Sequence, residues 1–79
     1  NYPNPFNQTS TIMVNLEEGA TLSLVVSNII GQKVMEINRG EVGAGSHNFT
    51  IDATGLETGV YFYTVISGQN SVTKKMIVE

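Results

Sequence analysis

Few side chains in this sequence could carry acid–base or metal chemistry. His47 is the only histidine in the 79 residues, and there is no cysteine. Ser46 precedes His47, and Asp52 follows it at an odd spacing, so on a β-strand both side chains would point away from the His47 face. A Ser–His–Asp relay is therefore not expected. A zinc site needs three or four clustered ligands and is not expected either.

Calcium and phosphate also lack a recognisable site in the sequence. Asp52 and Glu57 could hold calcium weakly, but the sequence has no spaced acidic loop of the EF-hand kind. The glycines at positions 40, 43 and 45 do not stand between a strand and a helix, as a phosphate-binding loop requires. We therefore expect no cofactor, no metal and no enzymatic activity.

The composition indicates one small domain, residues 1–79, with a thin core. A hydrophobic content of 41% with only 14% charged residues argues against disorder. The net charge is -3 and the bases form no cluster, which excludes a nucleic-acid partner. Without cysteine no disulfide can form, so packing alone must stabilise the fold.

The sequence shows neither a membrane span nor a signal peptide. No apolar run reaches the roughly 18 residues that a span needs, so we expect no membrane insertion. No basic segment is followed by an apolar stretch. Because the chain begins at Asn1 rather than methionine, we expect it to be part of a longer protein.

Apolar and polar side chains alternate along most of the chain, as in Ile12, Val14 and Leu16, whereas no window has the apolar period of a helix. Strands are predicted at 10–16, 20–28, 32–39, 46–52, 59–67 and 70–78, and a seventh could form near 1–6 or inside 40–45. Turn residues separate these runs, and Gly31 can supply the positive φ that closes one hairpin. The pattern predicts an all-β fold, a monomeric immunoglobulin-like antiparallel β-sandwich of six to seven strands.

Leu56, Gly59 and Tyr61 have the spacing of a tyrosine corner, in which a buried tyrosine hydroxyl bonds to upstream backbone. Leu56 would close one end of the sandwich, and Gly59 would let the chain turn. The alternative is that Tyr61 is an ordinary half-buried aromatic residue of a strand. Both interpretations are structural.

The two ends of the chain carry further cues. Pro3 and Pro5 stiffen the entry to the domain and give Phe6 a fixed place to dock, although they could also be a plain domain entry. At the other end Lys74 and Lys75 point to opposite faces of a terminal strand. They either protect an edge strand from aggregation or belong to a recognition strand at the free end of the chain.

Four segments, residues 2–6, 28–34, 56–61 and 75–78, together resemble the type A C-terminal sorting domain of type IX secretion cargo. The four segments occur in the order and at the spacing of that family, and the resemblance covers essentially the whole chain. The family usually ends on lysine, arginine or glutamine, whereas this chain ends on Glu79. An immunoglobulin-like sandwich that caps the flagellar hook is similar to the same family.

The resemblance implies a non-catalytic export signal that is covalently part of a larger cargo protein. Such cargo folds in the periplasm, is recognised by the outer-membrane type IX translocon, and is often cut and attached to the surface by a sortase-like cysteine protease. The implied localisation is the periplasm in transit, then the cell surface or the medium. Because the terminal strand lies at the free end, we expect it to carry translocon recognition. Its residues are Lys74, Lys75, Met76, Ile77 and Val78.

Two other functions stay open on the sequence alone: an extracellular accessory module that binds carbohydrate or an adhesive partner, and an inert spacer. Carbohydrate readers usually offer a planar row of exposed aromatic side chains. Here Tyr61, Phe62 and Tyr63 are consecutive, so they split between two faces, and there is no tryptophan. These features weigh against the carbohydrate module.

Overall fold

A computed structural model describes residues 8–79, and these residues form six strands and no helix. The strands are β1 Thr9–Leu16, β2 Ala20–Asn28, β3 Lys33–Val42, β4 Gly45–Asp52, β5 Gly59–Ser67 and β6 Asn70–Val78. Within these residues no helix is long and apolar enough to span a membrane. The six predicted strands are all present.

The predicted seventh strand is wrong for residues 40–45, because β3 continues to Val42 and β4 already begins at Gly45. Gly40 lies inside β3 with φ 69°, next to a shift of register opposite Leu22 and Ser23. A glycine at a bulge adopts this φ without strain, so the strand bends rather than ends there. The other predicted place, residues 1–6, lies outside the described residues.

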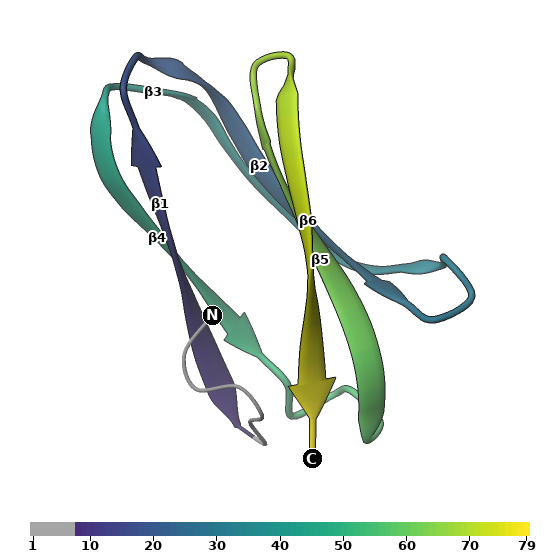
Figure 1. Cartoon of the computed structure of the whole chain (residues 1–79). Coiled ribbons are helices and arrows are strands. Elements are labelled where there is room, and N and C mark those ends of the chain that lie inside the picture. Colours follow the sequence, from purple (N-terminus) through teal and green to yellow (C-terminus); the bar gives the residue numbers. More distant parts are fainter. Residues whose placement is uncertain (1–7) are drawn as a thin grey trace.

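The strands form two antiparallel layers, which confirms the all-β sandwich (Figure 1). One sheet is the pair β1-β4, and the other has the order β3-β2-β5-β6. Within β2, Leu22, Leu24 and Val26 are completely buried while the residues between them are more exposed. The alternation of the sequence therefore sets which face of each strand enters the core.

The two sheets share one continuous ribbon from Thr9 to Asp52. The pairing of β1 with β4 runs from Thr9 opposite Asp52 to Leu16 opposite Gly45, and β2 with β3 continues it from Ala20 opposite Val42. The ribbon folds over at residues 17–19 and 43–44 (Figure 1, top), and the β5-β6 hairpin then pairs with β2. At this corner a Cβ on Gly19 would stand 3.0 Å from the Val42 carbonyl oxygen, so the close approach favours glycine.

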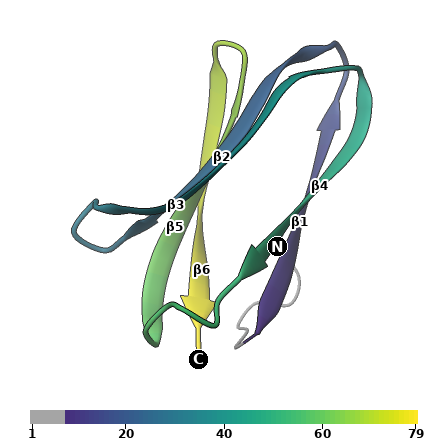
Figure 2. The same cartoon turned by 180° about the vertical axis from the view of Figure 1, so that it is seen from behind.

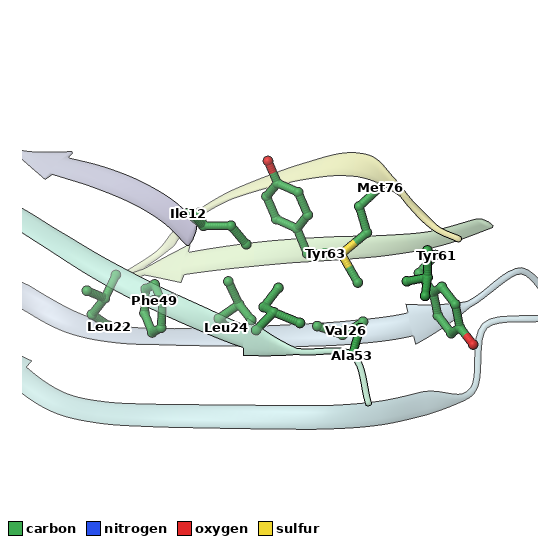
Figure 3. Close-up of a cluster of buried hydrophobic side chains, with 11 residues drawn as sticks. Ile12, Leu22, Leu24, Val26, Phe49, Ala53, Tyr61, Tyr63 and Met76 are labelled. Carbon is green, nitrogen blue, oxygen red and sulfur yellow. The ribbon is translucent and has the colours of Figure 1, made fainter. Parts of the chain in front are cut away.

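The core lies between the layers and draws side chains from both (Figure 3). Phe49 and Ile51 of β4 are completely buried, as is Met76 of β6. Among residues 8–79 the buried hydrophobic residues are Ile12, Leu22, Leu24, Val26, Phe49, Ile51, Ala53, Tyr61, Tyr63, Met76 and Val78. Because β6 contributes two of these residues, the end of the chain is a structural part of the sandwich.

Candidate recognition surface

The terminal strand β6 forms one edge of the four-stranded sheet, with β5 as its neighbour in the described chain. Its side chains alternate between two environments. Met76 is 0% exposed and Val78 is 2% exposed, so both face the core. Lys75 and Ile77 alternate with them and point to the outer face of the sheet. The core residues anchor the strand, while on its outer face Lys75 is exposed and Ile77 is half-buried.

Lys74 and Lys75 lie in different surroundings on β6. Lys74 pairs with Tyr63 on the face that Met76 shares, and it lines a groove between β6 and β1. Lys75 pairs with Phe62 on the outer face, where Phe62 is 38% exposed. Among residues 8–79 the one salt bridge joins Lys33 to Glu36, so neither lysine of β6 has a carboxylate partner there. Both charges can therefore meet an incoming acidic group.

Tyr61 holds the connection between β4 and β5. Its side chain is buried, and its hydroxyl donates a 2.7 Å hydrogen bond to the carbonyl oxygen of Glu57, four residues upstream. The N–H of Leu56 donates to the carbonyl oxygen of Ala53 at 2.9 Å, and the Leu56 side chain packs against the core. Gly59 is the first residue of β5 and lies two residues before Tyr61. This is the geometry expected of a tyrosine corner.

The tip of the β2-β3 hairpin is held by hydrogen bonds from backbone N–H groups to one side chain and exposes two isoleucines. The Asn28 side-chain oxygen accepts hydrogen bonds from the backbone N–H of Ile30 at 3.1 Å and of Gln32 at 2.9 Å. Gly31 closes the turn with φ 89°, as its position in the sequence predicts. Ile29 and Ile30 are left 71% and 74% exposed. The sequence did not reveal this exposure, since their chain position alone does not show that the hairpin extends beyond the sandwich (Figure 2).

The side chains with catalytic potential are engaged in local structure. The Nε2 atom of His47 lies 2.7 Å from the carbonyl oxygen of Gly43, a contact that ties β4 to the corner of the ribbon. The Ser46 hydroxyl donates to the side-chain oxygen of Asn15 at 2.6 Å. The carboxylate of Asp52 accepts from Thr54. The part of the chain that the structure describes holds no group of three or more metal-ligating side chains.

The hydrogen bonds of the Asp52 carboxylate predict that the stability of the fold depends on pH. The Thr54 backbone N–H at 3.0 Å and the Thr54 hydroxyl at 2.8 Å stabilise the carboxylate and lower its pKa below 3.8. The pKa of Asp52 is lower in the folded state than in the unfolded state. The stability that the ionised carboxylate contributes is therefore complete above the unfolded pKa and is lost as the pH falls through the folded pKa. We expect Asp52→Asn to reduce the difference in urea midpoint between about pH 7 and about pH 2.5.

A suitable control for this measurement is Glu41→Gln, because the exposed Glu41 carboxylate accepts no hydrogen bond in residues 8–79. That variant should keep the acid dependence of the unmodified chain. An equal change in both variants would show that the Thr54 contacts do not couple Asp52 to stability.

The remaining predicted site residues, Pro3, Pro5 and Phe6, lie outside the described residues.

Comparison with known families shows a match over the whole chain: the family described as the secretion system C-terminal sorting domain matches residues 1–79. A search of curated proteins found no match.

Proposed function

The chain belongs to the family of type IX secretion system C-terminal sorting domains, and we propose that it is the non-catalytic signal by which the translocon selects its cargo. The observation that carries the proposal is the family match over residues 1–79. The cargo is the larger protein to which the domain is attached. The route leads from the periplasm to the cell surface or the medium, with a sortase-like cysteine protease as the second partner.

We propose that β6 is the part of the domain that the translocon reads. An edge strand can be recognised through main-chain pairing, which gives affinity, while its side chains give specificity. Lys74 and Lys75 are exposed on opposite faces and have no carboxylate partner in residues 8–79. Charges of this kind steer and orient a partner of opposite sign. Ile77 adds an apolar contact on the outer face, and Met76 and Val78 hold the strand in position from inside.

The test is the export of a periplasmic fluorescent reporter fused to residues 1–79, in a host with a working type IX system. Replacing Lys74 and Lys75 together by alanine should lower export roughly tenfold, since it removes both steering charges. The free energy of unfolding should change by about 0.5 kcal/mol or less, because both side chains are exposed.

The matched control is Lys33→Ala, which removes an exposed lysine from β3, the opposite edge of the same sheet. Its export should equal that of the unmodified domain. Unchanged export by the double variant would rule out recognition through the two lysines. An equal loss in the control would indicate a response to net charge rather than to β6.

A further inference from the structure

Most of the exposed large apolar side chains of the described chain gather near the β2-β3 hairpin. In residues 8–79 the exposed large apolar residues are Met13, Ile29, Ile30, Val34, Val60, Phe62 and Val72. All but Met13 and Val72 lie in the hairpin or at the start of β5, the strand that pairs with β2 beside it. We call this group the apolar patch: Ile29, Ile30, Val34, Val60 and Phe62.

Strand pairing brings the members of the apolar patch close to one another. Phe62 lies opposite Ser27, two residues before Ile29. Val34 follows the residue of β3 that pairs with Ser27 from the other side. Val34 and Phe62 each stand next to a residue that packs in or against the core, so both point to the outer face of the sheet. The hairpin tip then carries Ile29 and Ile30 beyond the other strands (Figures 1 and 2).

The turn at the tip satisfies several of its own backbone donors. The N–H groups of Ile30 and Gln32 donate to the side-chain oxygen of Asn28, and the N–H of Gly31 donates to the Asn28 carbonyl oxygen at 3.0 Å. The Asn28 N–H donates in turn to the carbonyl oxygen of Gln32 at 2.9 Å. An apolar environment can therefore surround the tip without leaving these donors unpaired, which would otherwise be costly.

Neither the turn nor the core requires the two isoleucines at the tip. Turns favour glycine, proline, asparagine, aspartate and serine, because these residues suit the backbone of a turn. Ile29 is 71% exposed and Ile30 is 74% exposed, and neither belongs to the hydrophobic core. Apolar side chains that gather on the surface of a small domain are typical of a contact with another protein or with a membrane.

The charges around the apolar patch favour a protein over a membrane. Lys33, the cation next to the turn, is paired with Glu36 at 2.9 Å. Lys75, opposite Phe62, has no carboxylate partner in residues 8–79. Stable attachment to a bilayer through so few apolar side chains needs a cluster of basic residues as a second signal. One unpaired lysine beside the patch, in a domain of net charge -3, does not supply that signal.

We propose that the apolar patch docks in an apolar pocket of a protein of the export apparatus. The pocket receives Ile29 and Ile30, and its wall covers Val34 and Phe62. The same protein meets Lys75, because Lys75 and Phe62 are neighbours across the strands on one face. This inference rests on the proposed export function. It adds a contact surface on the β2-β3 hairpin, which is separate from β6.

The first test replaces Ile29 and Ile30 together by serine in the fusion of residues 1–79 to a periplasmic reporter. Export should fall about tenfold, since apolar anchors that fill a pocket dominate the affinity of an interface. The urea midpoint of the purified variant should stay unchanged, because both side chains are exposed. Replacing both residues by leucine keeps the apolar surface and should keep export.

The matched control is Met13→Ser, compared with Ile30→Ser alone. Met13 is 69% exposed and Ile30 is 74% exposed, so both changes remove a similar apolar surface. Met13 lies on β1 in the other sheet. Export should fall for Ile30→Ser and stay unchanged for Met13→Ser. An equal loss in both would show a general response to surface hydrophobicity and would overturn the proposal.

The second test identifies the occupant in living cells of the same host. The photoreactive residue p-benzoylphenylalanine is placed at position 30, at position 62, where it resembles the native phenylalanine, and at position 13. Positions 30 and 62 should form an adduct with the same protein, and position 13 should form none. An adduct with a second copy of the fusion, or recovery with membrane lipid and no protein adduct, would overturn the proposal.

The export results separate this inference from the proposed function. If the unmodified fusion is not exported, the proposed function fails and this inference fails with it. If the unmodified fusion is exported and the double serine variant is exported equally, the export function stands and the docking of the apolar patch is wrong. Loss of export by the leucine variant as well would contradict an apolar pocket.

Discussion

Replacing Tyr61 by alanine is expected to cost about 3 kcal/mol of stability, as large-to-small changes of buried aromatic residues do. Tyr61 is 7% exposed, and its hydroxyl makes a 2.7 Å hydrogen bond to the Glu57 carbonyl oxygen. The change therefore leaves a cavity at one end of the core and frees the connection between β4 and β5. A small domain has a free energy of unfolding of about 5 kcal/mol, so the change should remove more than half of it and lower the denaturation midpoint strongly.

Two further variants separate the causes of this loss. Tyr61→Phe keeps the ring and removes only the hydrogen bond, so it should cost about 1 kcal/mol. Phe62→Ala is the matched control, because Phe62 is the next residue on β5 but is 38% exposed on the outer face. Chemical denaturation measures all three. A loss below about 0.5 kcal/mol for Tyr61→Ala, or one equal to that of Phe62→Ala, would contradict the role given to Tyr61.

The strands and their buried faces could be predicted from the sequence because both follow from local alternation. In β2, the alternation of Leu22, Leu24 and Val26 with more polar neighbours is enough to define the core face. The bulge at Gly40 was missed, since a glycine inside a strand is easily taken for the end of that strand. The folding of one ribbon into two sheets could not be predicted either, because alternation gives the face of a strand and not its partner.

In the candidate site, too, features set by local alternation could be predicted, and features set by tertiary placement could not. The opposite facing of Lys74 and Lys75 follows from their adjacency on a strand. The contact of Arg39 with the Asn48 carbonyl oxygen could not be predicted from the sequence, because it depends on how β3 and β4 are placed relative to each other. The exposure of Ile29 and Ile30 depends on tertiary placement in the same way.

The second large effect is expected when the domain is transferred to a protein that is not normally exported. A fluorescent reporter that reaches the periplasm by its own leader should appear at the cell surface or in the medium when residues 1–79 are fused to its C-terminus. The same reporter without the domain should stay in the periplasm, because it lacks the signal. Deleting residues 72–79 is a poor control, since it removes Met76 and Val78 from the core and is expected to unfold the domain.

The most direct measurement compares this fusion in two hosts that differ only in a functional type IX translocon. Export is scored as surface and medium fluorescence against the periplasmic amount. If the domain is a type IX sorting signal, export appears in the host with the translocon and falls to the level of the reporter alone in the other. A folded fusion that stays in the periplasm of both hosts, or that leaves both equally, would contradict the proposed function and favour the accessory binding module.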